Sequence, residues 1–447
     1  MQKSKELPLD KKYNLKEYVI VSYENLHIAI FPEIASWILL KNTVQEKIFK
    51  SIADTKLCVQ ELMDKYKENQ SDLVYILTQI EAKQIETLNP KSIFENKKLH
   101  LHLTNKCNLR CPHCYMESGS AEKDELTTKE IFKLIEDFKN VAGGTSVGIT
   151  GGEPTVRDDF FEIVEFINSL GMEVNVYTNG TNWTEENVER FSKCKIKHVQ
   201  VSIDGFDEES NATIRGKGSF AKSLQAIDWF VKNGIYVKVA TTAPFEILKD
   251  HKQDYIDFAK TLIAKHGKDN IQVNFSHAFM PGRNLTNEQI ESFKDEYFNL
   301  VEDVVAEIVD GFEKEGFVLN VKGDLVDSCG YGSLNVRANG DFYFCDRIPD
   351  MKERHGNIRD MNFSEIFRLM KIAEGVGNIK NFKPCGDCEL RFICGGGCRI
   401  AEFKGFSEVI DVENVDFSKI EPKECDEKAM KARYYKLMVD TNERFYK

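Results

Sequence analysis

Between about residue 98 and residue 280, runs of β-forming residues alternate with amphipathic stretches of helical length, such as 128–140 and 219–233. The six runs are LHLHLT (99–104), VGIT (147–150), MEVNVYT (172–178), HVQVSID (198–204), YVKVATT (236–242) and IQVNFS (271–276). Alternation of this kind is typical of βα units, in which right-handed crossovers join parallel strands. We therefore expect an α/β fold with six βα repeats, whose parallel sheet curls into a partial barrel.

The first of these strands leads into three closely spaced cysteines, in the run Cys107-Asn-Leu-Arg-Cys111-Pro-His-Cys114 (the cysteine loop). The spacing CxxxCxxC allows one short loop to donate three thiolates to a single iron–sulfur cluster. Because a cubane [4Fe-4S] cluster has four irons, three thiolates leave one iron open to an outside ligand. The alternatives are three unrelated cysteines or a zinc site, which requires a fourth ligand close by. His113 is the only candidate nearby, and its place between Pro112 and Cys114 disfavours binding to the same ion.

Further motifs follow other strands at their carboxyl ends, where functional residues lie in folds of this kind. The run Gly151-Gly152-Glu153-Pro154 comes directly after the second strand. Ser202 and Asp204 alternate on the fourth strand, so their side chains face one side of the sheet. Each motif has a simpler interpretation, since glycines also form tight strand-to-helix turns and polar residues also cap them. Their shared position at strand ends favours a functional site.

The C-terminal third contains seven more cysteines and a glycine in the pattern C-x10-G-x4-C, then C-x2-C-x5-C-x3-C, then a last cysteine. These residues are Cys329, Gly340, Cys345, Cys385, Cys388, Cys394, Cys398 and Cys425. Seven thiolates divide poorly into tetrahedral zinc sites, but they suit one complete and one incomplete [4Fe-4S] cluster. The two remaining cysteines, Cys58 and Cys194, are expected to be structural, because buried free cysteine is common in protein cores.

Residues 1 to about 90 are expected to form a small separate domain. Two strands (18–23 and 26–31) are joined by a turn at Glu24-Asn25, and three helical patterns follow. This order describes a winged-helix-like module, and such modules often bind DNA. However, the segment has 12 lysines, 13 acidic residues and no arginine, which makes a poor surface for phosphate groups.

Overall composition narrows the functional class further. The net charge of −12 disfavours general binding to nucleic acid, which requires basic surface. The charged and polar start MQKSKELPLDKK is unlike a signal peptide. No apolar stretch reaches the roughly 18 residues that a membrane-spanning helix requires. We therefore expect a cytoplasmic enzyme with no membrane or nucleic-acid partner, and clustered cysteines that bind metal rather than form disulfides.

The cysteine loop and the motifs at the strand ends together resemble the radical S-adenosylmethionine (SAM) superfamily. The resemblance implies that SAM binds the open iron of a cluster held by Cys107, Cys111 and Cys114. The electron from this cluster would cleave SAM to methionine and a 5′-deoxyadenosyl radical. The residues that would contact SAM or shield the cluster are Gly151, Gly152, Glu153, Pro154, Ser202, Asp204, Arg215 and Tyr115.

Individual roles follow from the same resemblance. Glu153 and the backbone around it would hold the amino group of SAM, and Ser202 and Asp204 would receive its carboxylate and ribose. Arg215 would pair with the SAM carboxylate, to which an arginine fork is geometrically suited, although it also reads as a surface arginine. Tyr115 would shield the cluster or simply pack in the core.

The seven downstream cysteines match the SPASM extension of radical SAM enzymes position by position. The resemblance implies a fully ligated auxiliary cluster and a second one nearer the active site, and therefore three [4Fe-4S] clusters in all. The first set is Cys385, Cys388, Cys394 and Cys425, and the second is Cys329, Cys345 and Cys398. Relatives of the sulfatase-maturing kind supply an eighth cysteine between the first two, but residues 330–344 contain none. The chain departs from that pattern.

The N-terminal segment looks like the recognition element of enzymes that modify ribosomally made peptides. There the leader of the precursor adds a strand to the hairpin edge. The resemblance thus implies a winged-helix-like leader-binding domain (1–90), a radical SAM partial barrel (91–315) and a SPASM domain (316–447).

The expected function is that of an oxidoreductase with a reduced flavodoxin or ferredoxin-type electron donor. It would install a cross-link, first of all a cysteine thioether of the sactisynthase kind, in a precursor peptide. The alternatives are carbon–carbon cross-linking, oxidation of a single residue as in sulfatase maturation and, in another class, a redox-sensing DNA-binding regulator.

Overall fold

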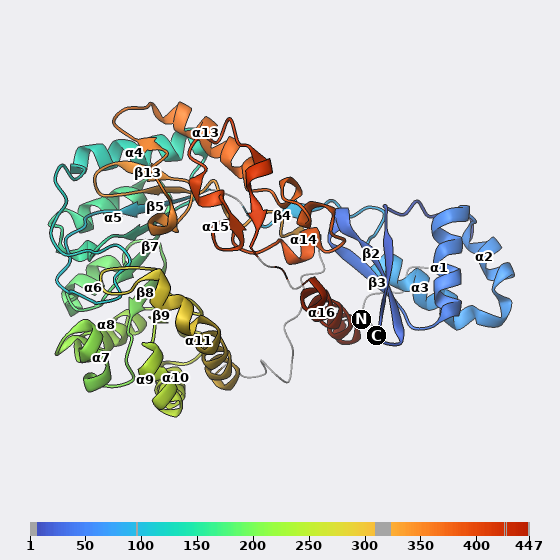
Figure 1. Cartoon of the computed structure of the whole chain (residues 1–447), viewed down its shortest axis with the longest axis horizontal. Helices are drawn as coiled ribbons and strands as arrows, with labels where there is room; N and C mark the ends of the chain where they lie inside the picture. Colours follow the sequence, from blue (N-terminus) through green and yellow to red (C-terminus); the bar gives the residue numbers. More distant parts are fainter. Residues whose placement is uncertain (1–6, 95–96, 309–322, 424, 426, 446–447) are drawn as a thin grey trace.

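The computed structural model describes residues 7–94, 97–308, 323–423, 425 and 427–445. Three parts lie in a row (Figure 1). The parallel-sheet region (residues 97–308) lies at one end, the N-terminal region (residues 7–90) at the other, and most of the C-terminal region (residues 323–445) between them. Within the described ranges, no helix combines the length and the apolarity needed to cross a membrane.

Six parallel strands, in chain order across the sheet, form the centre of the parallel-sheet region. They are β5 (Lys98–His102), β6 (Ser146–Thr150), β7 (Glu173–Thr178), β8 (Ile196–Ser202), β9 (Val237–Thr241) and β10 (Ile271–Phe275). The six strands expected from the sequence are confirmed, each within a few residues. Residues on one face of this sheet, such as Leu99, Leu101, Val147 and Ile149, are fully buried in the same core as the apolar faces of the helices.

The sheet continues beyond β5 with three strands from the C-terminal region, which the sequence did not predict. Strand β12 (Leu334–Val336) pairs parallel with β5, β13 (Asp341–Tyr343) pairs antiparallel with β12, and β14 (Gly356–Asn357) pairs antiparallel with β13. The result is one open sheet of nine strands, with β10 and β14 at its edges. The C-terminal region is therefore joined to the parallel strands by backbone hydrogen bonds.

Eight helices of the parallel-sheet region follow its strands. They are α4 (Thr128–Ala142), α5 (Phe160–Ser169), α6 (Glu185–Phe191), α7 (Glu208–Arg215), α8 (Ser219–Lys232), α9 (Phe245–Asp250), α10 (Lys252–His266) and α11 (Asn287–Ile308). Helix α4 shows why the sequence forms them. Thr127 and Glu130 form a capping box at its start, and Gly143 ends it at a positive φ. Its buried face comprises Ile131, Leu134, Ile135 and Phe138, and each such burial contributes about 1.5–3 kcal/mol.

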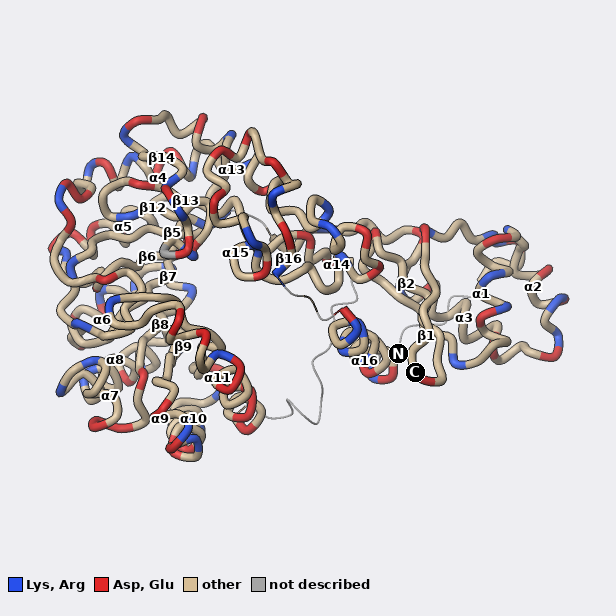
Figure 2. The backbone as a smooth tube through the Cα atoms, in the orientation of Figure 1, with Lys and Arg blue, Asp and Glu red and all other residues tan. Residues whose placement is uncertain are grey.

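The N-terminal region contains an antiparallel sheet of three strands followed by three helices. The strands are β1 (Val19–Tyr23), β2 (Leu26–Phe31) and β3 (Ser36–Leu40), and the helices are α1 (Thr43–Thr55), α2 (Val59–Lys65) and α3 (Gln70–Ala82). The expected hairpin and helices are present, whereas β3 was not predicted. Its run SWILL is short and uniformly apolar, so periodicity alone does not identify it as a strand. Figure 2 shows acidic and basic residues interspersed over the three helices.

Helix α16 (Glu427–Phe445) packs on the face of this sheet that α1 and α3 leave uncovered. The indole Nε1 of Trp37 donates a hydrogen bond to the carbonyl of Met438, at 3.1 Å. The buried ammonium of Lys83 donates to the carbonyl of Trp37 and to Oδ1 of Asn442, both at 2.7 Å. The end of the C-terminal region is thereby fastened to the first 90 residues.

The rest of the C-terminal region consists of short elements. Besides α13 (Phe363–Val376), it has the four-residue helices α14 (Arg391–Cys394) and α15 (Arg399–Glu402). Strand β11 (Asp324–Leu325) pairs with β4 (Lys91–Ser92), and β15 (Phe403–Lys404) pairs with β16 (Glu421–Pro422). Its cysteines are therefore positioned by turns and by long-range contacts more than by regular secondary structure.

Candidate functional site

The cysteine loop follows β5 and is closed by backbone hydrogen bonds. The amide of Cys107 donates to the carbonyl of Gly119 at 3.0 Å, and the amide of Arg283 donates to the carbonyl of Cys114 at 3.2 Å. The guanidinium of Arg283 adds a side-chain hydrogen bond to the carbonyl of Cys111, at 3.1 Å. Two thiols also accept hydrogen bonds, at 3.4 Å each, from the amides of Leu109 and Ser118. The loop is thus held by its backbone, and its thiols are oriented by nearby amides.

The three thiols fit an iron–sulfur cluster by their chemistry. They are half-buried, carry no disulfide, and interact electrostatically with one another. Burial raises the pKa of Cys107 to about 11 and raises the pKa of Cys111, so both are protonated thiols until metal binds. Binding to iron requires thiolates, and the metal supplies the charge that stabilises them. In the described part of the chain, no three His, Cys, Asp or Glu residues are arranged for a single metal ion.

The glycines of the Gly151–Pro154 motif pack directly against the backbone that leads into the cysteine loop. The amide of Gly152 donates to the carbonyl of Thr104 at 2.8 Å, and that of Glu153 to the carbonyl of Lys106 at 3.0 Å. A Cβ at Gly152 would lie 2.4 Å from the carbonyl oxygen of Lys106. The motif therefore requires glycine here and fixes the cysteine loop to the end of β6.

A cavity of about 260 Å³ brings most of the expected site residues together. Among its lining residues are Cys107, Cys111, Cys114, Tyr115, Gly151, Gly152, Ser202, Asp204 and Arg215. Glu153 and Pro154 do not line it. The carboxylate of Glu153 is fully buried and accepts hydrogen bonds from Thr155, from Thr178 at 2.8 Å and from the amide of Asn179 at 2.7 Å. Burial raises the pKa of Glu153, and its expected contact with SAM stays a prediction.

Asp204 forms a buried charge pair that the sequence did not predict. Its Oδ2 accepts a hydrogen bond from Nε of Arg215 at 2.6 Å and lies 3.3 Å from Nε2 of His113. Its Oδ1 accepts from the amide of Thr242 at 2.9 Å. Burial alone would raise the pKa of Asp204, but Arg215 and His113 outweigh it and lower this pKa to about 2. The aspartate is therefore anionic at neutral pH and holds Arg215 at the wall of the cavity.

Two further cavities continue from the first. One of about 470 Å³ shares Tyr115, Thr150, Tyr177 and Gln200 with it, and is also lined by His100 and His102. The other, of about 770 Å³, lies between α11 and the C-terminal region and shares His277–Phe279 and Arg347 with the second. The three cavities thus form a series, each sharing lining residues with the next, from the cysteine loop to the third cavity, which we call the outer cleft.

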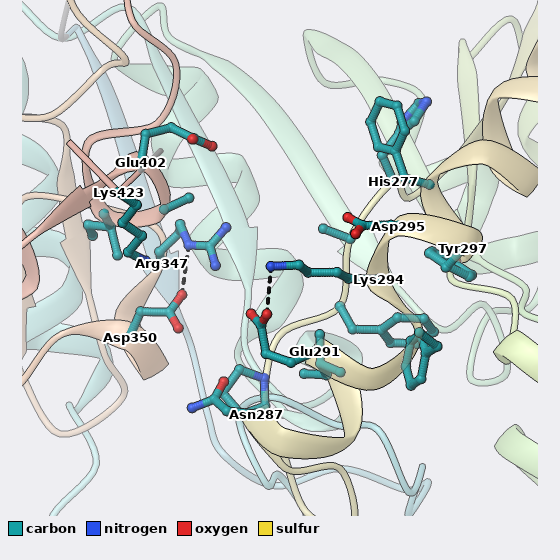
Figure 3. Close-up of a pocket in the computed structure, with 18 of the residues that line it drawn as sticks. His277, Asn287, Glu291, Lys294, Asp295, Tyr297, Arg347, Asp350, Glu402 and Lys423 are labelled. Atoms are coloured by element: carbon teal, nitrogen blue, oxygen red, sulfur yellow. Dashed lines mark hydrogen bonds and ion pairs between the residues drawn. The ribbon is translucent and has the colours of Figure 1, made fainter. Parts of the chain in front are cut away.

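Charged side chains from two parts of the molecule line this outer cleft (Figure 3). Arg347 and Asp350 form an ion pair on the side of the C-terminal region, with Nε and Oδ2 2.7 Å apart. Glu291 and Lys294 form another on α11, opposite the first. The cleft can therefore contact polar and charged groups along its length.

The downstream cysteines fall into two groups by their electrostatic contacts. Cys345 is buried and interacts with Cys329 and Cys398, whereas Cys385 interacts with Cys394 and Cys425. For Cys388 no contact with the other downstream cysteines is shown, and the division of the seven cysteines between two clusters stays a prediction. Burial raises the pKa of Cys388 to about 11.

Comparisons with known proteins show which domains the chain contains. A model described as the radical SAM superfamily matches residues 101–262, and one described as an iron–sulfur cluster-binding domain, SPASM, matches residues 328–389.

Among curated proteins, the AdoMet-dependent heme synthase of Methanosarcina barkeri is 28% identical over 70% of this chain and 93% of its own length. The mycofactocin maturase MftC of Mycolicibacterium smegmatis is 28% identical over 67% of this chain and 77% of its own. The sporulation killing factor maturation protein SkfB of Bacillus subtilis is 28% identical over 65% and 69%.

Solved structures show the same fold. Native anSMEcpe with bound AdoMet matches with a TM-score of 0.51 and 20% identity, over 77% of this chain and 99% of that one. SuiB of Streptococcus suis bound to S-adenosylmethionine matches with a TM-score of 0.50 and 14% identity, over 87% of this chain and 96% of that one.

Proposed function

Because this chain is a radical SAM enzyme that carries a SPASM domain, we propose that it installs an oxidative cross-link in a ribosomally made precursor peptide. The series of cavities from the cysteine loop to the outer cleft carries this proposal. Such a path admits an extended chain with one reactive residue at its inner end. MftC and SkfB, which are maturation proteins by name, support the same class of substrate.

The proposal keeps the three-part organisation, with a winged-helix-like leader-binding domain (1–90), a radical SAM partial barrel (91–315) and a SPASM domain (316–447). In support, the three-stranded sheet of the N-terminal region has two edge strands, β1 and β3, and an extended peptide adds to a sheet edge through main-chain hydrogen bonds. The setting is cytoplasmic, and a reduced flavodoxin or ferredoxin-type protein supplies the electron.

Three [4Fe-4S] clusters and SAM are the proposed cofactors. The ligands are Cys107, Cys111 and Cys114 for the first, Cys329, Cys345 and Cys398 for the second, and Cys385, Cys388, Cys394 and Cys425 for the third. With a reduced cluster and SAM bound, the cofactors supply a 5′-deoxyadenosyl radical that removes one hydrogen atom from a peptide carbon.

The residues of the chain bind the cofactors and orient them relative to the peptide. Asp204 accepts a hydrogen bond from Nε of Arg215. Because a guanidinium has five N–H donors in all, Arg215 retains donors for a carboxylate such as that of SAM. Tyr115 lies at the boundary of the first two cavities and separates the cofactor from the peptide path.

We propose a cysteine thioether as the product. Bond formation between the carbon radical and a cysteine of the same peptide releases the thiol proton and one electron. The C-terminal region, with its seven cysteines, is the place for clusters that accept this electron. Carbon–carbon coupling and oxidation of a single residue are the alternatives, and they differ in the fate of the cysteine.

The test is an anaerobic reaction of the reconstituted enzyme with SAM, dithionite and a precursor peptide encoded beside its gene. We expect 5′-deoxyadenosine, a peptide that has lost two hydrogen atoms, and a cysteine that no longer reacts with iodoacetamide. Loss of two hydrogens with a still reactive cysteine would replace the thioether by carbon–carbon coupling or by oxidation of a single residue such as serine.

The similarity to a heme synthase supports a second candidate, a tetrapyrrole substrate. A parallel reaction with iron-coproporphyrin III in place of the peptide separates the two. Consumption of the porphyrin, with no change in the mass of any precursor, would overturn the peptide proposal.

A further inference from the structure

Arg399 is a fully buried arginine that follows Cys398 at the start of α15. Its guanidinium donates to four neutral carbonyls, those of Gly377 at 3.0 Å, Gly395 at 2.8 Å, Gly397 at 2.7 Å and Asp327 at 3.5 Å. It also lies over the rings of Phe382 and Phe403, at 5.2 and 5.8 Å from their centroids. All these contacts hold the group in place, and none of them neutralises its charge.

The loop before α15 provides carbonyl groups that accept hydrogen bonds from this guanidinium. Gly395, Gly396 and Gly397 all have positive φ angles, of 69°, 67° and 70°. Residues with a Cβ rarely adopt such angles in succession. This backbone turns the carbonyls of Gly395 and Gly397 toward Arg399.

The counter-charge of Arg399 is missing from its immediate surroundings. Over the described ranges, no carboxylate forms an ion pair with it. The acidic group that acts on it electrostatically is Asp327, whose carboxylate accepts hydrogen bonds from Ser92 at 2.5 Å and Asn378 at 3.4 Å. A buried charge without a counter-charge is costly, so its presence points to an anionic group nearby.

The thiols around Arg399 are the natural source of that charge. Its guanidinium interacts electrostatically with Cys329, Cys385 and Cys398. These residues belong to both sets of downstream cysteines, so the guanidinium lies within reach of both sites. Thiols become thiolates when they bind iron, and a thiolate-ligated [4Fe-4S] cluster carries net negative charge.

We propose that Arg399 is the shared counter-charge of the two auxiliary clusters and raises the reduction potentials of both. This inference rests on the proposed function, in which both sites hold clusters. Reduction adds one negative charge to a cluster, and a fixed positive charge in a dry site favours that change. Arg399 thereby makes the auxiliary clusters better acceptors for the electron that leaves the peptide.

The experiment compares the reconstituted holoenzyme with Arg399→Gln and Arg399→Lys. Iron and sulfide analysis gives the cluster content, and a redox titration followed by electron paramagnetic resonance gives the midpoint potentials. In Arg399→Gln we expect the midpoint potentials of both auxiliary clusters to fall by at least about 59 mV, which corresponds to a tenfold change in a one-electron equilibrium constant. Arg399→Lys should stay near the wild type, and the cluster of the cysteine loop should keep its potential in both variants.

Arg368→Gln is the matched control, because it removes one positive charge from the same region. Arg368 is exposed and forms ion pairs with Glu365 and Glu413 on the surface, where solvent and salt screen its charge. We expect no change in any midpoint potential.

Each outcome decides between charge compensation and a purely structural role. Clusters that are lost in Arg399→Gln but kept in Arg399→Lys would support the counter-charge. Unchanged potentials in Arg399→Gln would overturn it. Loss of the clusters in both variants would also overturn it, because lysine keeps the positive charge but not the forked hydrogen bonds of arginine, so the loss would follow from the hydrogen bonds. A wild-type enzyme without auxiliary clusters would overturn the proposed cofactors as well, and the iron analysis separates these cases.

Discussion

The parallel-sheet region and the C-terminal region both contain cysteines that we propose as cluster ligands, but they position them differently. In the first, three cysteines lie between Cys107 and Cys114, in one loop that is hydrogen-bonded to the backbone at the end of the next strand. In the second, seven cysteines are spread from Cys329 to Cys425 among short elements such as the four-residue helices α14 and α15. A compact ligand set can be identified from its spacing, whereas a dispersed set acquires its geometry from long-range folding.

The same contrast separates the backbones of the two regions. Helix α4 spans 15 residues and has its own cap at each end. In the C-terminal region, the amide of Val326 donates to the carbonyl of Phe392, and that of Ile379 to the carbonyl of Asp327. Because these partners are distant in sequence, this region forms only when several segments meet.

The largest expected effect tests whether the two cysteine regions work independently. Replacement of Cys107, Cys111 and Cys114 by Ala should abolish SAM cleavage and lower bound iron by about one third, one cluster of three. The downstream clusters should survive, because their ligands lie in another region. Production of 5′-deoxyadenosine and iron content are the measurements, with Cys58→Ala/Cys194→Ala as the control. A triple variant that still cleaves SAM would refute the assignment of the loop.

The second effect concerns the N-terminal region, which the C-terminal region fastens in place. Deletion of residues 1–90 should leave SAM cleavage without peptide intact but remove tight binding of the precursor. Since the deletion also uncovers α16, a second variant that lacks residues 427–447 is needed. In that variant we expect faster amide exchange in β3, together with weaker precursor binding.

Hydrogen exchange of the intact enzyme gives the complementary measurement. A leader that adds to the sheet should protect the amides of one edge strand, β1 or β3, when the precursor is added. If neither strand gains protection while the precursor binds tightly, the leader binds elsewhere.

The third effect is spectroscopic and concerns the cluster expected at Cys329, Cys345 and Cys398. With three protein thiolates, one iron is open to a substrate cysteine, which the metal would deprotonate. A cysteine-containing precursor should perturb the Mössbauer or paramagnetic signature of this cluster alone, and a precursor with serine in place of cysteine should not.

Asp346 is a protein group that competes for the same position, since its Oδ1 lies 3.8 Å from Sγ of Cys345 and it lines the second cavity. A spectrum that changes in Asp346→Asn without peptide, but does not respond to the precursor, would show that Asp346 completes the cluster. Thiolate capture would then be wrong.

The smallest effect is a pH dependence at Lys83, which links the N-terminal region to the C-terminal region. Burial lowers the pKa of Lys83 to about 7, whereas a lysine in an unfolded chain titrates near pH 10.4. Between about pH 10 and pH 7, the unfolded chain therefore binds a proton at this lysine and the folded protein does not. The free energy of unfolding consequently decreases as the pH falls through this range. Chemical denaturation should show a smaller loss in Lys83→Met than in the wild type. Lys50→Met, at an exposed lysine of α1, is the control and should behave as the wild type does.

The regular part of the fold could be predicted from the sequence because its signals are local. Each strand from β5 to β10 is an apolar run that ends in a turn, and each crossover shows helical periodicity. Strand β12 was missed because its three residues form a strand only beside β5. The run Ser36–Leu40 was missed because a short apolar segment does not reveal its period.

In the candidate site, too, the local features could be predicted from the sequence, whereas the contacts between distant residues could not. The spacing of the cysteine loop and the Gly151–Pro154 motif indicated their common location, and the structure brings Cys107 and Gly152 into one cavity. The pair of Asp204 and Arg215 was not predicted, since no sequence rule states that a strand end and the end of the following helix α7 meet. The burial of Arg399 among carbonyls likewise depends on tertiary packing.

The contact between α16 and the N-terminal sheet also sets an order of events during protein synthesis. The ribosome makes Ile28, Ile30 and Trp37 early, but their covering helix emerges only after Cys425 and every other proposed cluster ligand. An unfinished nascent chain therefore presents an uncovered tryptophan and its apolar neighbours, the kind of surface that chaperones bind. Closure of this face by α16 marks a polypeptide that already contains all ten cysteines proposed as cluster ligands.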